Sequence, residues 1–194
     1  MTDTNIRIAT SDDEAALVDV ITLGFSTDPM ARWTLPQAQQ YLETMPSFVR
    51  AFGGKAFELG TAYYVEAYAG AALWLPPGSE PDGERLVALV KEQAPADRLP
   101  DAMRVFEEMS RYHPTGPHWY LPMIAMDPTL QGRGYGSALM RTALARCDQD
   151  GLPAYLESSN PRNIPLYRRH GFEATGTIQV GSSPVMTPML RPAR

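Results

Sequence analysis

The feature that most constrains the fold is a glycine-rich stretch at residues 131–136 (Gln-Gly-Arg-Gly-Tyr-Gly). It follows an apolar run, residues 121–126, which has the length of a buried strand. Asp127 and Pro128 end that run, because proline cannot donate to a sheet ladder. Residues 137–147 then carry apolar side chains at helical spacing. The glycine-rich stretch therefore lies at a strand-to-helix junction.

Glycines on alternate positions let the backbone at this junction approach a bulky anion and turn several N–H groups toward it. The free amides and the positive end of the following helix favour a phosphate or pyrophosphate there, and Arg133 can add a charged contact. The pattern is not a P-loop, because no Lys-Ser/Thr pair follows the last glycine, and its spacing is G-x-G-x-G rather than G-x-G-x-x-G. From the spacing alone, a plain turn is an equal alternative.

Two blocks of the sequence resemble the GNAT family of N-acetyltransferases. Gln131-x-x-Gly134-x-Gly136 after an apolar strand is similar to the acyl-CoA pyrophosphate loop of that family. Residues 160–172 (Asn-Pro-Arg-Asn-Ile-Pro-Leu-Tyr-Arg-Arg-His-Gly-Phe) resemble its N-x-x-A-x-x-L/F-Y-x-x-x-G-F segment, at the expected distance downstream. Residues 156–167, together with 73–78 and 186–189, are most similar to the puromycin N-acetyltransferase-like branch. The resemblance covers most of the chain.

The order of the predicted elements indicates a mixed α/β (α+β) sheet. In the middle of the chain strands alternate with helices, which requires parallel neighbours, while the flanking hairpins near 57–75 and 173–190 are antiparallel. The family resemblance implies a mostly antiparallel sheet of about seven strands, with helices on both faces and central parallel strands splayed around the CoA site. No linker or repeat divides the chain, so we expect a single domain over 1–194, with an insertion at 81–115 of open role.

Composition narrows the class of function. The formal net charge of −5 argues against a nucleic-acid partner and suits a cationic substrate. A single cysteine, Cys147, suits a reducing compartment and lies on the apolar face of its helix, where it is a buried bystander rather than a nucleophile. No apolar run approaches the length of a membrane span, so we expect a cytoplasmic protein without a membrane partner. Three histidines and no H-E-x-x-H spacing predict no metal site.

The resemblance implies acetyl-CoA as the donor and direct attack by an amine, without an acyl-enzyme. By the same resemblance, the end of the central strand would bond the pantetheine amides through its backbone, and the loop amides would hold the pyrophosphate. The expected cofactor-binding residues are Ile124, Ala125, Met126, Gln131, Gly132, Arg133, Gly134, Tyr135, Gly136, Ser137, Asn160, Asn163 and Tyr167.

Tyr167 is the expected general acid. In the family, the matching tyrosine lies close to the CoA sulfur and can protonate the leaving thiolate. A phenol with a reference pKa of about 10 stays protonated at neutral pH and can act in this way. An ordinary half-buried aromatic residue is the alternative. Asn163, one helical turn earlier on the same face, stands where many members carry alanine, and its role stays open.

The sequence offers several candidates for the general base and for the acceptor site, in contrast to the single candidate for the general acid. An ammonium acceptor must lose a proton before attack, and Glu157, at the C-terminal end of its strand, is the first candidate, ahead of His118 and Glu108. A structural hydrogen-bonding role for Glu157 is the alternative. In the family the region between the first two helices forms one wall of the acceptor site. The substrate-binding candidates are therefore Phe25, Asp28, Arg32 and Trp33, with packing as the alternative for each.

The sequence thus predicts an acetyl-CoA-dependent N-acetyltransferase acting on the primary amine of a small molecule. The branch resemblance favours an aminonucleoside or antibiotic-like acceptor, although acceptor walls differ freely between relatives. Two alternatives stay open: the protein acetylates a protein N-terminus or lysine, or it is a non-catalytic acyl-CoA-binding regulatory domain. Whether two copies pair as a homodimer through the last strands stays open.

Overall fold

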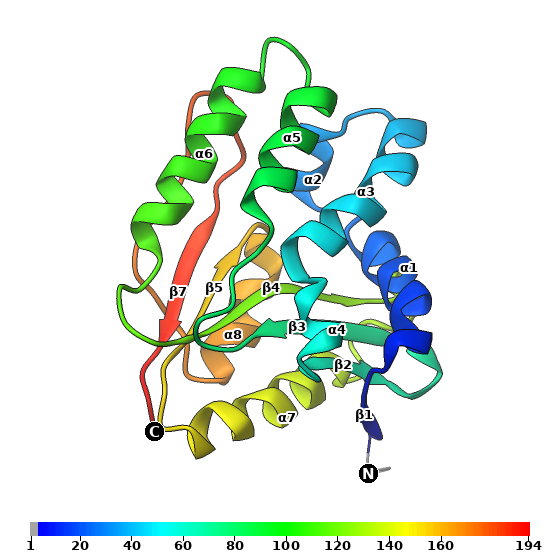
Figure 1. Ribbon diagram of the computed structural model, residues 1–194, viewed down its shortest axis with the longest axis vertical. Coiled ribbons are helices and arrows are strands. Elements are labelled where there is room, and N and C mark those ends of the chain that lie inside the picture. The colour runs from blue at the N-terminus through cyan, green and yellow to red at the C-terminus, as the bar shows by residue number, and fades with distance from the viewer. Residues whose placement is uncertain (1–3) are drawn as a thin grey trace.

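The described residues form one seven-stranded sheet with the order β1-β2-β3-β4-β5-β7-β6; in Figure 1, β2, β3 and β4 run across the middle, and β5 and β7 run steeply beside them. The computed structural model describes residues 4–194. Among the described strands only β4 and β5 pair in parallel, so the expected mixed, mostly antiparallel sheet is confirmed. The strands are β1 (Ile6–Ile8), β2 (Ala62–Val65), β3 (Gly70–Leu75), β4 (Trp119–Met126), β5 (Ala154–Ser158), β6 (Glu173–Ala174) and β7 (Thr187–Arg191).

Helices cover both faces of the sheet, because its strands alternate buried side chains between the two. In β3, Leu73 and Leu75 face one core with α1, α3, α5 and α6, while Ala72 and Trp74 face the other with α7 and α8 (Figure 1). The helices are α1 (Glu14–Gly24), α2 (Pro29–Thr34), α3 (Ala38–Gly53), α4 (Lys55–Glu58), α5 (Gly83–Gln93), α6 (Leu99–Tyr112), α7 (Tyr135–Gln149) and α8 (Ile164–Arg169). Within residues 4–194 no helix has the length and apolar character of a membrane span.

The two parallel strands part soon after they meet. β4 pairs with β5 only at Trp119↔Ala154 and Tyr120↔Tyr155, while β4 continues beside β3 and β5 continues beside β7. Pro122, which has no N–H, follows the last paired residues of β4 and cannot donate to a ladder there. The carboxyl ends of β4 and β5 are therefore separated, as the family resemblance implied.

Two predicted segments differ from the structure. The hairpin expected near 57–75 begins only at Ala62, because the short helix α4 occupies the preceding residues and Gly60 turns the chain at φ 64°. The closing hairpin near 173–190 is mostly irregular: β6 has two residues, and Ile178↔Met186 is an isolated bridge. The insertion at 81–115 forms α5 and α6, which stand beside each other at the top of Figure 1.

Candidate active site

A cleft of about 390 Å³ opens where β4 and β5 part; we call it the loop cleft. Its walls are the end of β4, the glycine-rich loop that follows, the α8 segment and the end of α1. The residues that line it are Gly24, Phe25, Thr27, Asp28, Ile124, Ala125, Met126, Gln131, Gly132, Gly134, Gly136, Ser137, Asn160, Arg162, Asn163, Leu166, Tyr167 and Arg169.

The glycine-rich loop has a backbone that other residues would not adopt readily. Gly132 and Gly134 have φ of 77° and 86°, and Gly134 is the N-cap of α7. A Cβ at either position would meet nothing within 4 Å, so glycine is needed for the left-handed backbone rather than for space. The loop thereby delivers the first turn of α7, with Gly136 and Ser137, to the wall of the loop cleft. Unpaired N–H groups at such a helix start bind anions.

Most of the expected cofactor-binding residues meet in this cleft, and two do not. Arg133 is exposed, and Tyr135 packs against the core beneath α7; neither lines the cleft. Arg162 and Arg169 do line it, although the sequence reasoning did not name them. They lie seven residues apart within residues 160–172, and this spacing keeps two residues on one helical face. The spacing could therefore have identified them from the sequence.

Tyr167 faces the loop cleft from α8 and is 5% exposed. Burial, and secondarily the charge of Asp28, raise the pKa of its phenol well above the usual range. Its ring meets Phe172 edge-on, with centroids 6.3 Å apart. A neutral phenol held in this way keeps its proton at neutral pH, as a general acid must.

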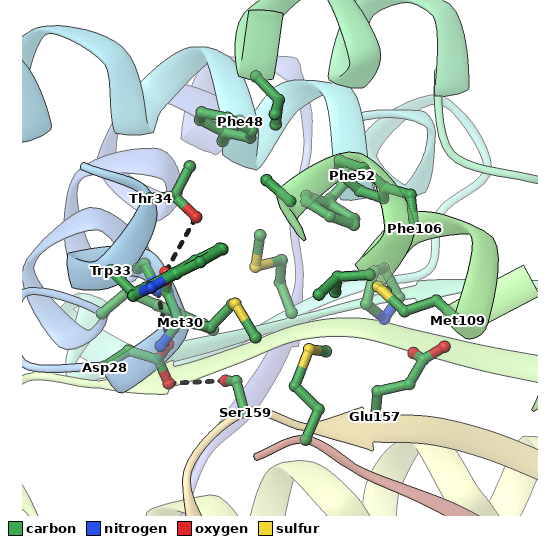
Figure 2. A pocket seen from close by; sticks show the side chains of 18 of the residues that line it. Asp28, Met30, Trp33, Thr34, Phe48, Phe52, Phe106, Met109, Glu157 and Ser159 are labelled. Carbon is green, nitrogen blue, oxygen red and sulfur yellow. Dashed lines mark hydrogen bonds between the residues drawn. The ribbon is translucent and has the colours of Figure 1, made fainter. Parts of the chain in front are cut away.

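A second cavity, of about 120 Å³, lies on the α6 side of the sheet; we call it the apolar cavity. Side chains of α2, α3 and α6 surround it, and β4 and β5 lie beneath it (Figure 2). Phe25 and Asp28 line both the apolar cavity and the loop cleft, so the two spaces meet there. The remaining lining residues are Met30, Ala31, Trp33, Thr34, Leu35, Met45, Phe48, Phe52, Val90, Ala102, Val105, Phe106, Met109, Tyr120, Pro122, Met123, Glu157, Ser159 and Met186.

Asp28 fixes the junction between the two spaces. It is the N-cap of α2, where its Oδ1 accepts from the backbone N–H groups of Met30 and Ala31, both at 3.0 Å. Its Oδ2 accepts from the Ser159 hydroxyl at 2.6 Å, the bond drawn in Figure 2. Desolvation raises the pKa of this buried carboxyl, although the three hydrogen bonds oppose the shift. Asp28 therefore ties α2 to the segment after β5.

Glu157 rises from β5 at the other end of the cavity floor, with its carboxylate directed toward Met109 (Figure 2). Its side chain is 2% exposed, and its Oε1 lies 3.1 Å from Nε2 of His113. Burial first, and then the nearby Glu157 charge, raise the pKa of the Tyr120 and Tyr155 phenols. The two carboxylates of the apolar cavity thus lie on the sheet side, below an apolar upper wall.

The remaining candidates are distributed as follows. Trp33 lines the apolar cavity, but Arg32 does not: it donates to the Pro36 carbonyl at 2.7 Å, and its guanidinium lies 4.9 Å from the centre of the Tyr41 ring. Of the two further base candidates, Glu108 pairs with an arginine on the outside of α6, and Nδ1 of His118 lies 2.8 Å from the Gly116 carbonyl. Neither lines the cavity.

No cluster of three histidine, cysteine, aspartate or glutamate side chains that could hold a metal occurs in the part of the chain that the structure describes.

Several known proteins are similar to this chain over part or all of its length. A profile of the acetyltransferase (GNAT) family matches residues 102–172. An uncharacterised N-acetyltransferase of Schizosaccharomyces pombe is 30% identical over 133 residues, which are 58% of this chain and 51% of that protein, so the chain spans about half the length of this relative. An acetyltransferase of Stachybotrys chartarum is 24% identical over 193 residues, 91% of this chain and 84% of that protein.

Solved structures share the fold. The crystal structure described as histone acetyltransferase HPA2 and related acetyltransferase from Corynebacterium glutamicum has 26% sequence identity and a TM-score of 0.71, and the match covers 100% of this chain and 98% of that one. The family profile, these relatives and this solved structure are all described as acetyltransferases, and the chain is similar to each of them over the stated share of its length.

Proposed function

We propose that the protein is an acetyl-CoA-dependent N-acetyltransferase that acetylates the primary amine of a small molecule. One observation carries the proposal: the loop cleft and the apolar cavity meet at Phe25 and Asp28. A donor in the first space and an acceptor in the second can therefore bring their reacting atoms to the same point. Such positioning supplies a large part of the rate of a two-substrate transfer.

The residues that line the loop cleft suit acetyl-CoA in their charge and in their free backbone groups. The amides at the start of α7 face the cleft and suit a pyrophosphate, and Arg162 and Arg169 add positive charge. Beyond Tyr120, β4 pairs with no described strand on its β5 side, so its backbone there is free to pair with an amide-bearing chain such as pantetheine. When bound, acetyl-CoA supplies an activated acetyl group as a thioester.

The two candidate catalytic side chains lie in different spaces, as the reaction requires. Glu157, in the apolar cavity, takes one proton from the ammonium of the acceptor, which leaves a neutral amine able to attack the acetyl carbon. Tyr167, in the loop cleft, gives its proton to the departing thiolate. The C–N bond forms, the C–S bond breaks, and the second amine proton returns to Tyr167 or to water.

The size of the apolar cavity supports a small acceptor over a protein. An engineered apolar cavity of about 150 Å³ holds one benzene molecule, so a space of about 120 Å³ suits a body of one ring or less. Met186 lines this cavity and belongs to a segment, 186–189, that is similar to the puromycin N-acetyltransferase-like branch. An aminonucleoside or antibiotic-like amine is therefore one acceptor to test. The buried thiol of Cys147 suits a reducing compartment, and we place the reaction in the cytoplasm.

Thermal unfolding with and without acetyl-CoA, with NADH and ATP as controls, tests the donor site. A ligand at about 100 times its dissociation constant adds about 2.7 kcal/mol to the free energy of unfolding. We expect a shift confined to acetyl-CoA, followed by release of free thiol when an accepted amine is added. Folded protein that shows no shift contradicts the proposal.

The Tyr167→Phe variant separates an enzyme from a non-catalytic acyl-CoA-binding domain. We expect it to keep the acetyl-CoA shift and to lose turnover at saturating acetyl-CoA by about 100-fold or more, since it removes the proton donor but little volume. Unchanged turnover across pH refutes the acid role. An acetyl-CoA shift without turnover on any amine, in the native protein, supports the binding domain instead.

A further inference from the structure

We propose that the acceptor is a primary amine with one positive charge and a compact apolar body, such as an arylalkylamine or a branched alkylamine, rather than a diamine or polyamine. This inference rests on the proposed function and specifies its substrate class. The observation behind it is the division of the apolar cavity into two parts, which we call the acidic floor (Asp28 and Glu157) and the apolar roof (Trp33, Phe48, Phe52, Phe106 and Met109); Figure 2 labels both.

The acidic floor offers one place for an ammonium. Asp28 already accepts three hydrogen bonds, two from α2 amides and one from Ser159. Glu157 has a side chain that is 2% exposed, and its carboxylate is directed into the cavity (Figure 2). A buried carboxylate is stabilised by an ammonium at hydrogen-bond distance. The charge of the acceptor therefore belongs beside Glu157, which lines the apolar cavity and not the loop cleft.

The apolar roof offers no place for a second ammonium. Asp28 and Glu157 are the only carboxylates among the described residues that line the cavity, and both belong to the floor. A second ammonium at the roof would face the rings of Phe48, Phe52 and Phe106 and the thioether of Met109 (Figure 2). Burying a charge without a partner costs several kcal/mol, whereas an apolar group in the same place is stabilised by its contacts with the roof. The roof thus selects against diamines.

The test compares 2-phenylethylamine with putrescine, two acceptors of which only the second carries a second charge. The measurement is kcat/KM from thiol release at saturating acetyl-CoA. We expect 2-phenylethylamine to be preferred by about tenfold or more, because a single apolar group already contributes that much discrimination. Equal or better use of putrescine overturns the inference and leaves the proposed function standing. Stabilisation by acetyl-CoA without turnover of any amine defeats the proposed function itself.

Variants of the roof make the same test within the protein. Phe106→Asp puts a carboxylate opposite the floor, while Phe106→Leu is the matched control that keeps the position apolar. We expect Phe106→Asp to raise the putrescine to 2-phenylethylamine ratio of kcat/KM by about tenfold or more, and Phe106→Leu to leave the order unchanged. If Phe106→Asp does not fold, Met109→Glu on the half-buried next turn replaces it. An unchanged ratio in a folded acidic variant overturns the inference.

A second inference rests on a different contact: we infer that His113 carries the proton from Glu157 to water. Glu157 has almost no exposed side-chain surface, whereas the side chain of His113 is 30% exposed, and Nε2 of His113 lies 3.1 Å from Oε1 of Glu157. The ring is held in place by Tyr120 and Tyr155, with centroid distances of 4.7 and 4.6 Å, and by His118 at 5.8 Å. His113 thus connects a buried carboxylate to the surface.

The proton steps balance as follows. Glu157 takes the ammonium proton and passes it to the unprotonated Nε2 of His113, and the resulting imidazolium loses its Nδ1 proton to water. Exchange with water then restores the starting tautomer. The other titratable groups that face this pair are Tyr120, Tyr155 and His118, and burial and the Glu157 charge hold the two phenols neutral by raising their pKa. They therefore do not compete for the proton at neutral pH.

His113→Gln tests the proton-carrying role, with His118→Gln as the matched control, because the His118 ring also packs against Tyr155 but only His113 pairs with Glu157. We expect His113→Gln to lower kcat roughly tenfold or more, to change the pH profile of kcat, and to regain activity with added imidazole. The acetyl-CoA shift and the amine KM stay unchanged. A variant with an unaltered pH profile, or with a loss that imidazole does not restore, overturns this inference; a loss equal to that of His118→Gln does so as well.

Discussion

The loop cleft and the apolar cavity share Phe25 and Asp28 but are built in opposite ways. The loop cleft comes mainly from two short segments, 124–137 and 160–169, and four of its lining residues are glycines. The apolar cavity is lined by side chains of α2, α3, α5, α6, β4 and β5, which are spread over most of the sequence. Binding in the loop cleft should therefore depend on backbone conformation. Binding in the apolar cavity should depend on the identity of individual side chains.

The largest expected effect comes from removing the carboxylate of Glu157 in the apolar cavity. Glu157→Gln keeps the shape of the side chain but cannot take a proton, so we expect kcat to fall about 100-fold to 10,000-fold. The acetyl-CoA shift in thermal unfolding should stay the same, because Glu157 does not line the loop cleft. Thiol release and thermal unfolding measure the two quantities.

Glu108→Gln is the matched control for this prediction. Glu108 is a carboxylate on the outside of α6, paired with Arg111, and it does not line the apolar cavity. It should keep native turnover. If Glu157→Gln also keeps turnover within about twofold, Glu157 is a structural residue and the base lies elsewhere.

A change in the backbone of the glycine-rich loop should affect binding in the loop cleft alone. Gly134→Ala forces a Cβ into the left-handed region at φ 86°, which costs roughly 1–2 kcal/mol, and it moves the amides that face the loop cleft. Gly78→Ala is the matched control, since Gly78 has φ 80°, equally open space and no place in either cavity. Both variants should lose similar stability.

Only Gly134→Ala should weaken acetyl-CoA binding, by about tenfold if the strain is relieved by a loop shift. Calorimetric titration of acetyl-CoA and denaturant unfolding separate the two effects. Equal affinity in Gly134→Ala and Gly78→Ala would show that the amides of the loop do not hold the donor.

The same difference explains how much the sequence could predict. The loop cleft was predictable because its parts are contiguous: an apolar strand, a glycine-rich turn and a helix start are local patterns with a local physical reason. The sheet followed from the order of strands and helices and from the family resemblance. Arg133 does not line the cleft, because spacing indicates that a residue belongs to a loop but not which way its side chain points; its contact with the cofactor stays a prediction.

The apolar cavity could not be predicted in the same way. Phe48 and Phe52, and likewise Val105 and Met109, lie four residues apart and read as ordinary core faces of helices. That their helices leave a space above Glu157 is a property of how α3 and α6 pack on the sheet. His113 was overlooked for a related reason: only the fold brings the residue after α6 to within 3.1 Å of β5.

Asp28 should give an intermediate effect, because it belongs to both spaces. Asp28→Asn keeps an oxygen for the amides of Met30 and Ala31 but removes the charge. We expect a rise of a few fold, about threefold to tenfold, in the amine KM. Loss of the Asp28 charge also lowers the pKa of Tyr167, although burial, the larger cause, still keeps the phenol neutral at pH 7.

The pH dependence of stability provides a second readout for Asp28. Burial raises the folded-state pKa of Asp28 above its unfolded value of about 3.9, so its contribution to stability is fully present below that value and is lost as pH rises through the folded-state pKa. The asparagine variant lacks this loss. Its melting temperature relative to the native protein should therefore rise between pH 4 and neutral pH, and a difference that stays flat or falls contradicts the buried charge.

The smallest effect is expected at Cys147, which lies in neither space. It is fully buried on α7 against the sheet, its thiol donates to the Ala143 carbonyl at 3.5 Å, and burial raises its pKa to about 12. Because the thiolate is the reactive form, a thiol reagent at pH 8 should leave the native protein unmodified and label it only after unfolding. Labelling of the native protein would mean that α7 opens readily, and with it the start of the helix that the loop cleft uses. If Cys147 stays protected, thiol release in the amine assays reports the leaving thiol alone. The turnover of the variants in both spaces can then be measured without subtracting a signal from the protein's own thiol.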